Sequence, residues 1–182
     1  MHTRSTHLRR VERRDAPFLR DLELLPGSNT AWRFAGHRPT VEEYERDLGS
    51  YLRADTVTLR SSGERIGLVG LRSANPMSGI AYLTLLSDPS ITGHARMLEA
   101  LAAFLLSAYE APQLRKVYAE VPAFAWSRFQ AGEGRYFHQE GLLVDHVVTP
   151  TGFADLHVIA FDKDVWQGLG AELRPRIGLE AR

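Results

Sequence analysis

Residues 80–96 read IAYLTLLSDPSITGHAR and join an apolar run to a helix start through a short polar turn. Residues 80–86 are almost uniformly apolar, which is typical of a central strand that is buried on both faces. Asp88-Pro89 marks a turn, and apolar residues then recur at helical spacing from about Gly93 to Tyr109. This stretch predicts a buried strand, a loop and a long amphipathic helix.

The loop and the helix start have the chemistry of a phosphate-binding site. A helix N-terminus presents unpaired N–H groups and a positive partial charge. Gly93 lets the backbone approach a phosphate closely, and Ala95 keeps the next inward position small. The residues suited to line such a site are Ser90, Ile91, Thr92, Gly93, His94, Ala95 and Arg96. Taken alone, the same residues also fit an ordinary capped helix start.

The flanking segments place this unit in a layered domain. Before it, the sequence predicts an edge strand over 8–14, a helix opened by Asp15, a second helix opened by the capping box Thr40-Val41-Glu42-Glu43, and strands over 56–60 and 65–72. After it, the sequence predicts a strand over 115–121, a helix over 127–139, and a hairpin of strands 142–149 and 153–161. This order indicates one α/β domain with a mixed sheet over residues 1–166, followed by a loosely held tail at residues 167–182.

The composition excludes several classes of protein. The chain has 182 residues, of which 44% are hydrophobic, enough to form the core of one domain. The formal net charge is zero, so no basic field indicates a nucleic-acid partner. Cysteine is absent, which rules out thiolate metal sites and a cysteine nucleophile and fits a cytoplasmic location. No apolar run approaches the roughly 18 residues of a membrane span, and the histidine spacing predicts no metal site.

Four motifs, in this order along the chain, resemble those of the GNAT superfamily of N-acetyltransferases. Residues 65–71, Arg-Ile-Gly-Leu-Val-Gly-Leu, are similar to its third strand. Residues 90–95 resemble its cofactor signature Gln/Arg-x-x-Gly-x-Gly/Ala, with serine at the first position. Glu140-Gly141-Leu142-Leu143 falls where the family has Gly-Phe at the end of its last helix, and the hairpin from Asp145 to His157 resembles the RimJ/RimL-like branch.

The resemblance runs from about Leu8 to Trp166. It implies an α/β GNAT fold with a mixed central sheet of about seven strands, helices on both faces and a splayed fourth and fifth strand pair. It also implies an N-acyltransferase that uses acetyl-CoA, or another acyl-CoA, to acylate a primary amine of a peptide or protein N-terminus or of a small metabolite. The pantetheine arm of the cofactor would lie in the strand gap along Leu85, Leu86 and Ser87. Because relatives are often dimers, the resemblance also allows that this chain forms a homodimer.

The transfer needs a group that accepts the proton of the amine and a group that protonates the leaving thiolate. Glu120, on the strand after the long helix, is the candidate base, although a solvent-facing strand residue would look the same. The family's acid is a tyrosine four residues before the terminal glycine, a position that holds Phe137 here. The neighbouring Tyr136 can replace it only if the predicted helix is irregular, which Gly132 and Gly134 permit.

Aromatic and imidazole side chains are the candidates for the acceptor pocket: Trp32, Phe34, His146 and His157. Core packing explains many such residues equally well. The serine at position 90 and the displaced tyrosine also leave open a catalytically degenerate GNAT-fold protein that binds acyl-CoA or acts as a regulatory partner. A third possibility is an α/β domain whose likeness to the GNAT superfamily is accidental. This possibility predicts no gap in the sheet.

Overall fold

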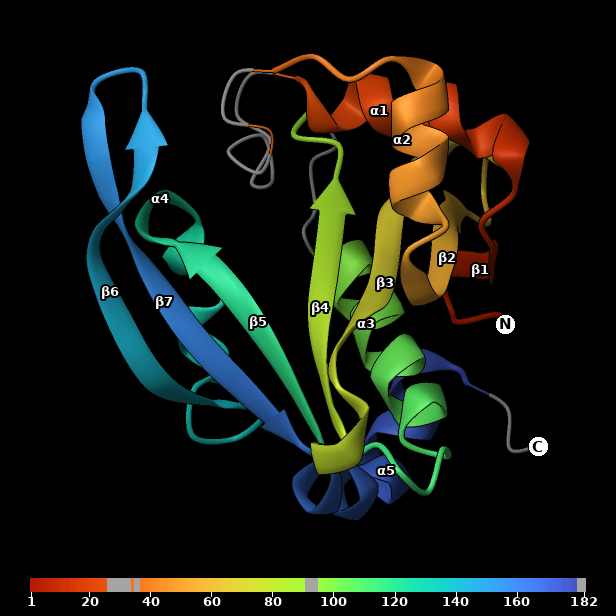
Figure 1. The fold of residues 1–182 in the computed structure, drawn as a ribbon. Coiled ribbons are helices and arrows are strands. Elements are labelled where there is room, and N and C mark those ends of the chain that lie inside the picture. Colours follow the sequence, from red (N-terminus) through yellow and green to blue (C-terminus); the bar gives the residue numbers. More distant parts are fainter. Residues whose placement is uncertain (26–33, 35–36, 91–94, 180–182) are drawn as a thin grey trace.

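The computed structural model describes residues 1–25, 34, 37–90 and 95–179. Its centre is a seven-stranded sheet with the order β1-β2-β3-β4-β5-β7-β6 (Figure 1). Neighbouring strands are antiparallel except for the parallel pair β4 and β5. The strands are β1 Thr6–Arg10, β2 Tyr51–Leu59, β3 Arg65–Asn75, β4 Ile80–Ser87, β5 Lys116–Pro122, β6 His138–Thr149 and β7 Gly152–Asp162. The predicted mixed sheet is confirmed, with β1 as an edge strand.

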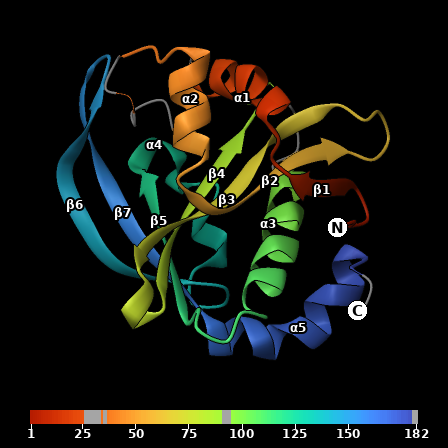
Figure 2. The ribbon, with the colours of Figure 1, turned by 45° about the vertical axis from the view of Figure 1, so that its right-hand side comes forward.

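Helices lie on both faces of this sheet (Figure 2). Helices α1 (Ala16–Glu23) and α2 (Val41–Leu48) cover one face, where they share an apolar cluster with β2, β3 and β4. Helices α3 (Ala95–Ala108) and α5 (Lys163–Ile177) cover the other, together with the short helix α4 (Ala123–Trp126). None of the helices in the described part of the chain combines the length and the apolar character that crossing a membrane requires.

The capping box predicted at the start of α2 is present. The Thr40 hydroxyl accepts a hydrogen bond from the Glu43 amide at 3.2 Å, and the Glu43 carboxylate accepts one from the Thr40 amide at 2.8 Å. These bonds satisfy N–H groups that the first turn of a helix leaves without partners. The local sequence therefore determines where α2 begins. The helix ends at Leu48, and β2 begins at Tyr51.

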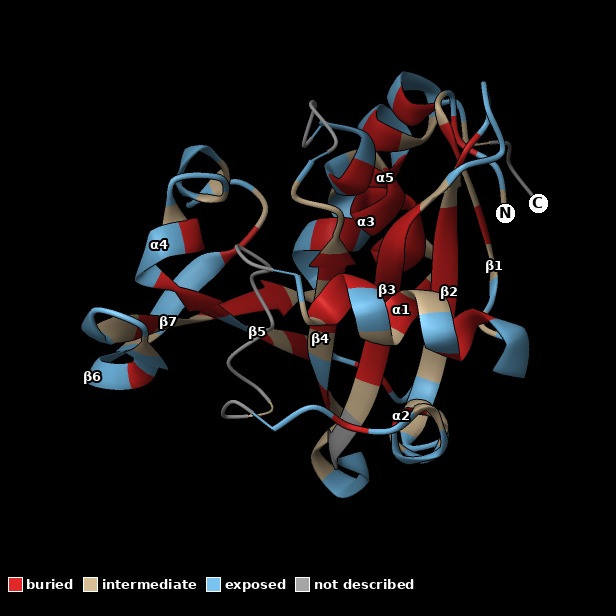
Figure 3. Cartoon of the chain, turned by 90° about the horizontal axis from the view of Figure 1, so that it is seen from above, coloured by how far each residue is buried: buried red, intermediate tan, exposed pale blue. Residues whose placement is uncertain are grey.

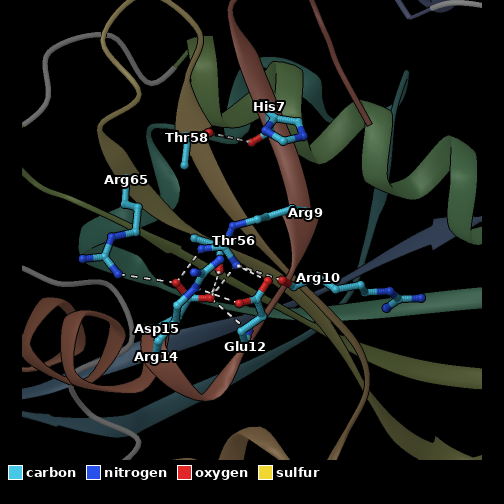
Figure 4. A network of polar contacts seen from close by, with 9 residues as sticks. All are labelled: His7, Arg9, Arg10, Glu12, Arg14, Asp15, Thr56, Thr58 and Arg65. Atoms are coloured by element: carbon cyan, nitrogen blue, oxygen red, sulfur yellow. Dashed lines mark hydrogen bonds and ion pairs between the residues drawn. The ribbon is translucent and has the colours of Figure 1, made fainter.

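Asp15 precedes α1 but does not cap it with its side chain. Its carboxylate is fully enclosed and accepts two hydrogen bonds of 2.7 Å from the Arg9 guanidinium, as Figure 4 shows. Further bonds come from the Glu12 amide at 2.9 Å, the Thr56 hydroxyl at 3.2 Å and Arg65 at 3.4 Å. Burial raises the pKa of Asp15, but the bonds from Arg9 and Glu12 outweigh this effect and hold the pKa below its usual value. The network ties the edge strand to β2, β3 and the start of α1.

The main core lies between the sheet and α3. The helix buries nine of its residues, among them Ala100, Phe104 and Leu105. At its end the Tyr109 hydroxyl donates a hydrogen bond of 2.6 Å to the Phe161 carbonyl of β7. Figure 3 shows that buried residues concentrate around α3 and strands β2 to β4, whereas the β6–β7 end is largely exposed.

The helix predicted over 127–139 is wrong. Helix α4 ends at Trp126, a single 3-10 turn covers Gln130–Gly132, and β6 has begun by His138. Gly134 adopts a positive φ of 76°, a backbone conformation that ends helical geometry and that glycine adopts readily. Gly141 consequently lies within a strand rather than at the end of a helix.

The chain after Trp166 also differs from the expectation of a loosely held tail at residues 167–182. Helix α5 continues to Ile177, and its residues Trp166, Leu173 and Ile177 are buried. Pro175 lies inside the helix, and Gly178 ends it in the left-handed region. The apolar spacing of this segment is sparse, and tertiary contacts hold it in place: α5 packs against α3 and β7, and the Ile177 carbonyl accepts a hydrogen bond of 2.6 Å from the Arg4 amide.

Candidate functional site

Strands β4 and β5 part after three residue pairs. They pair from Ile80 opposite Lys116 to Tyr82 opposite Tyr118 and then spread apart, as Figure 1 shows. On its other side β4 stays paired with β3 as far as Ser87. In the described part of the chain, the pairing of β4 with β5 therefore stops at Tyr82. A gap between two strands leaves room for an extended ligand beside the main chain of β4.

The side chains of β4 alternate between the two faces at the gap. Leu85 lies on the α3 face and Ser87 is half-buried at the end of the strand, where both line a small cavity of about 20 Å³. Leu86 points to the opposite face and is buried in the cluster under α1 and α2. Of the three residues predicted to hold the pantetheine arm, Leu86 can therefore contribute only its backbone.

The predicted phosphate site begins beside this strand end. Ile91, Thr92, Gly93 and His94 lie outside the described residues. Ser90 is exposed, and both its amide and its hydroxyl donate to the Asp88 carboxylate, at 2.8 and 2.6 Å. Ala95 and Arg96 are exposed on the first turn of α3, so the start of this helix faces solvent next to the gap.

Glu120 lies on the opposite face of the sheet from α3. Val117, Ala119 and Val121 of β5 are buried in the core on the α3 face. Because side chains alternate along a strand, Tyr118 and Glu120 point to the other face. Glu120 is exposed and lies two residues beyond the last pair that joins β5 to β4. The structure thus places a carboxylate on the face opposite the predicted cofactor helix.

Tyr136 lies on the α3 side of the sheet, whereas Glu120 points to the opposite face. It belongs to the turn before β6, its ring centroid lies 6.2 Å from that of Trp166, and its carbonyl accepts a hydrogen bond of 2.7 Å from the Trp166 indole. Together with Phe137, it lines a cavity of about 430 Å³ between α3 and α5. Neither residue lines the small cavity at the end of β4. The structure does not bring Tyr136 and Glu120 together.

The predicted acceptor residues are also dispersed. Trp32 lies outside the described residues, and Phe34 packs toward Tyr44, with 6.1 Å between ring centroids. His157 stacks on Trp126 at 4.2 Å and shares a hydrogen bond of 2.7 Å with Gln139.

The two histidines do not face each other. His157 pairs in register with Leu142, whereas exposed His146 lies in an irregular part of β6, where the register shifts between Leu143 and Val147. His157 opposes Val121 of β5, so it lies on the α4 face of the sheet, away from Glu120.

A polar network that the sequence does not predict lies on the same face as Glu120. The Glu140 carboxylate accepts hydrogen bonds of 2.5 Å from Lys116 and from the Tyr118 hydroxyl, and it contacts His138 at 3.0 Å. The other nitrogen of the His138 ring lies 3.2 Å from Asp162. The Lys116 and Tyr118 bonds hold the pKa of Glu140 at about 2, and they raise the pKa values of both donors.

No local signal identifies this network, because Glu140 reaches its partners through a bulge. The pairing of β6 with β7 shifts between Gln139 and Gly141, so Glu140 has no direct partner in the register. A bulge reorients a side chain in a way that strict alternation does not foresee. Among the described residues, no group of three or more acidic or histidine side chains could hold a metal ion.

Solved structures with the same architecture show which fold this is. Spermidine N-acetyltransferase from Vibrio cholerae in complex with CoA and spermine is 21% identical, with a TM-score of 0.70 over 89% of this chain and 98% of that one. RimL, a ribosomal L7/L12 alpha-N-protein acetyltransferase in complex with CoA, is 18% identical, with a TM-score of 0.71 over 89% of this chain and 96% of that one. No protein-family model and no curated protein sequence matches the chain. The chain has the GNAT fold that the resemblance implies, including the splayed strand pair.

Proposed function

We propose that the chain is an acyl-CoA-dependent N-acyltransferase that acts on a primary amine. The observation that carries this proposal is the gap between β4 and β5, which has the start of α3 on one face and exposed Glu120 on the other. Such a gap gives a thioester and an amine separate routes to one point in the sheet. The proposal is supported by the two solved structures described above, which bind CoA and are both named as N-acetyltransferases.

The described residues fit an acyl-CoA. The gap beside β4 suits an extended pantetheine arm, because the β4–β5 pairing stops at Tyr82 and a strand binds an extended ligand through main-chain groups. The exposed first turn of α3, with Ala95 and Arg96, suits the phosphates. We assign the amine to the opposite face, where it meets Glu120.

In the reaction, the amine nitrogen attacks the thioester carbonyl, a C–N bond forms, and the C–S bond breaks to release the thiolate of CoA. Glu120 accepts the proton that the ammonium group must lose, directly or through a water molecule. Because Tyr136 lies in the other cavity, we assign the proton for the thiolate to solvent or to the nitrogen of the tetrahedral intermediate, which loses its second proton as the amide forms, rather than to this tyrosine. The acceptor is the N-terminus of a peptide or protein, as in the RimJ/RimL-like branch, or a small metabolite amine.

A binding protein without catalysis is the second candidate, and specific features favour it. Ser90 replaces the glutamine or arginine of the family signature, and its hydroxyl is already bonded to Asp88. No tyrosine lines the small cavity at the end of β4, among the residues that the structure describes. Such a protein would bind acyl-CoA as a sensor or a regulatory partner.

Calorimetric titration with acetyl-CoA, followed by an amine panel, separates the candidates. The panel should contain spermidine, spermine and peptides with free N-termini. Binding together with release of free thiol supports the enzyme. Binding without turnover on any amine favours the sensor. Absence of binding at millimolar acetyl-CoA would contradict both the enzyme and the sensor.

A further inference from the structure

We propose that Tyr82, at the point where β4 and β5 part, binds the ammonium group of the acceptor beside Glu120, and that Tyr118 positions its ring. The inference rests on the proposed function and names the residues that hold the amine before Glu120 accepts its proton. It also gives the Glu140 network, which the sequence does not predict, a role in holding Tyr118.

Tyr82 faces the side of the sheet that we assign to the amine. Ala81 and Leu83 of β4 pack into the core on the α3 face, so Tyr82 between them points to the opposite face. Tyr82 and Tyr118 form the last residue pair between β4 and β5, and their ring centroids lie 5.8 Å apart. Two neighbouring aromatic rings therefore lie at the closed end of the gap.

Glu120 is the next residue of β5 on this face. It follows Tyr118 by two positions, which places the two Cα atoms about 7 Å apart. Tyr82 is 39% exposed and Glu120 is exposed, so a ligand on this face has access to both. A cation over a tyrosine ring is attracted by the negative face of the ring. An ammonium group held by Tyr82 therefore lies within reach of the carboxylate that accepts its proton.

The charges on this face favour a cationic ligand. Glu120 and the two carboxylates of the network, Glu140 and Asp162, are negative, whereas Lys116 is positive. His138 adds a positive charge only when it is protonated. An excess of negative charge raises the local concentration of cations. An amine that arrives protonated is thus drawn to the face that carries its base.

Of the two rings, Tyr82 is the one that a ligand can use. The Lys116 ammonium lies 5.7 Å from the Tyr118 ring centroid, so a cation of the protein itself already interacts with Tyr118. Arg72, which pairs with Tyr82 in the β3–β4 register, lies over the Tyr51 ring at 4.1 Å. Among the residues that the structure describes, no cation lies over Tyr82.

The Glu140 network holds Tyr118 in place. The Tyr118 hydroxyl donates a hydrogen bond of 2.5 Å to Glu140, which also accepts one of 2.5 Å from Lys116 and contacts His138 at 3.0 Å. A network whose members are all bonded fixes the side chains that it joins. Tyr118 is therefore a positioning residue, which keeps the Tyr82 ring beside Glu120.

Steady-state kinetics with the best amine of the panel test the role of Tyr82. Tyr82→Leu removes the ring and should raise the KM for the amine roughly fivefold, with kcat and the KM for acetyl-CoA within about twofold of the wild type. Tyr82→Phe keeps the face of the ring and should leave all three values within about twofold. Phe153→Leu, at an exposed aromatic residue of the β6–β7 hairpin, is the matched control and should change none of them.

NMR spectra of the protein with labelled tyrosine rings give a readout that needs no turnover. Butylammonium added to the CoA-bound protein should shift the Tyr82 ring signals, which are assigned through their loss in Tyr82→Phe. The neutral probe 1-butanol has the same chain length, and at the same concentration it should shift these signals much less, because it carries no charge.

A double-mutant cycle tests the positioning role of Tyr118. Tyr118→Phe and Glu140→Ala remove the same hydrogen bond, so each should raise the KM for the amine about twofold and the double variant should raise it no further. Additive effects would show that Glu140 attracts the amine by its charge rather than through Tyr118, and they would overturn this role.

The remaining outcomes separate the inference from the proposed function. An unchanged KM for the amine in Tyr82→Leu overturns the inference and leaves the enzyme intact. Equal shifts with butylammonium and 1-butanol also overturn it, as does a Tyr82→Phe variant as impaired as Tyr82→Leu, because the hydroxyl would then hold the amine. A selective shift without turnover of any amine supports the inference and contradicts the enzyme. Absence of both contradicts the two together.

Discussion

The two halves of the sheet differ in how they are covered. Strands β1 to β4 carry helices on both faces, and the apolar cluster under α1 and α2 draws side chains from β2, β3 and β4. Among the described residues, that cluster includes none from β5, β6 or β7. Among the described residues, the second half is covered on the α3 face alone, and its other face holds Glu120 and the Glu140 network. In the proposed function the first half is therefore the scaffold, and the second half carries the face assigned to the amine.

Two carboxylates illustrate the difference. Asp15 in the first half is fully enclosed and held by Arg9 with two bonds of 2.7 Å. Glu140 in the second half is also held by bonds to basic and phenolic groups, but it is exposed. Removing a partner from an enclosed ion pair leaves a charge without solvent, whereas an exposed charge regains water. The same chemistry should therefore contribute far more to folding in the first half than in the second.

Asp15→Asn should have the largest effect on stability. We expect a loss of about 3 kcal/mol in the free energy of unfolding, because the variant removes the enclosed carboxylate that accepts two hydrogen bonds from the Arg9 guanidinium. Urea denaturation at pH 7 measures this loss. Asp21→Asn, at an exposed carboxylate beside Arg20, is the control and should change stability by less than about 1 kcal/mol.

The difference in stability between the wild type and Asp15→Asn should depend on pH, because the pKa of Asp15 is lowered in the folded protein. A carboxyl group with a depressed folded-state pKa stabilises the fold fully above its ordinary value of about 3.9, and the stabilisation is lost as pH falls through the folded-state pKa. The gap between wild type and Asp15→Asn should accordingly shrink below about pH 4. A gap that stays constant down to pH 2 would contradict the assigned role.

Glu120→Gln should reduce catalysis without affecting the fold. If Glu120 accepts the proton of the amine, we expect kcat to fall about 100-fold at pH 7, with the affinity for acetyl-CoA unchanged. Steady-state kinetics with the best amine of the panel, together with thermal unfolding, measure both. Glu110→Gln, at the far end of α3, is the matched control, and equal activity of the two variants would remove Glu120 from the mechanism.

Lys116→Met should have only a small effect on stability and a clear effect on the titration of Glu140. Without the Lys116 bond, the pKa of Glu140 should rise from about 2 toward its ordinary value of about 4.3. The change in unfolding free energy should stay below about 1 kcal/mol, because Glu140, the charge that loses its partner, is exposed. Carboxyl NMR titration measures the pKa, and Lys163→Met is the control. An unshifted pKa of Glu140 would show that the contacts with Tyr118 and His138 are enough to hold it low.

Patterns with local causes were predictable. The capping box at Thr40 and Glu43, the strand at 80–87 and the apolar stripe of α3 follow from interactions between residues near in sequence. Glu120 could be assigned to a strand for the same reason. The segment 127–139 could not be assigned, because its glycines permit several conformations and the packing of Phe137 against Phe161 selects one.

The sequence by itself determined the order of the seven strands, the mixed sheet and the strand–loop–helix unit at 80–96, because each depends on periodicity and local hydrogen bonds. Only the tertiary structure decided that β4 and β5 part after Tyr82, that Glu140 meets Lys116 and Tyr118, and that α5 closes a cavity beside α3. These features join residues that lie far apart along the chain. Their positions depend on the twist of the sheet, on a bulge and on helix packing, which no local pattern records.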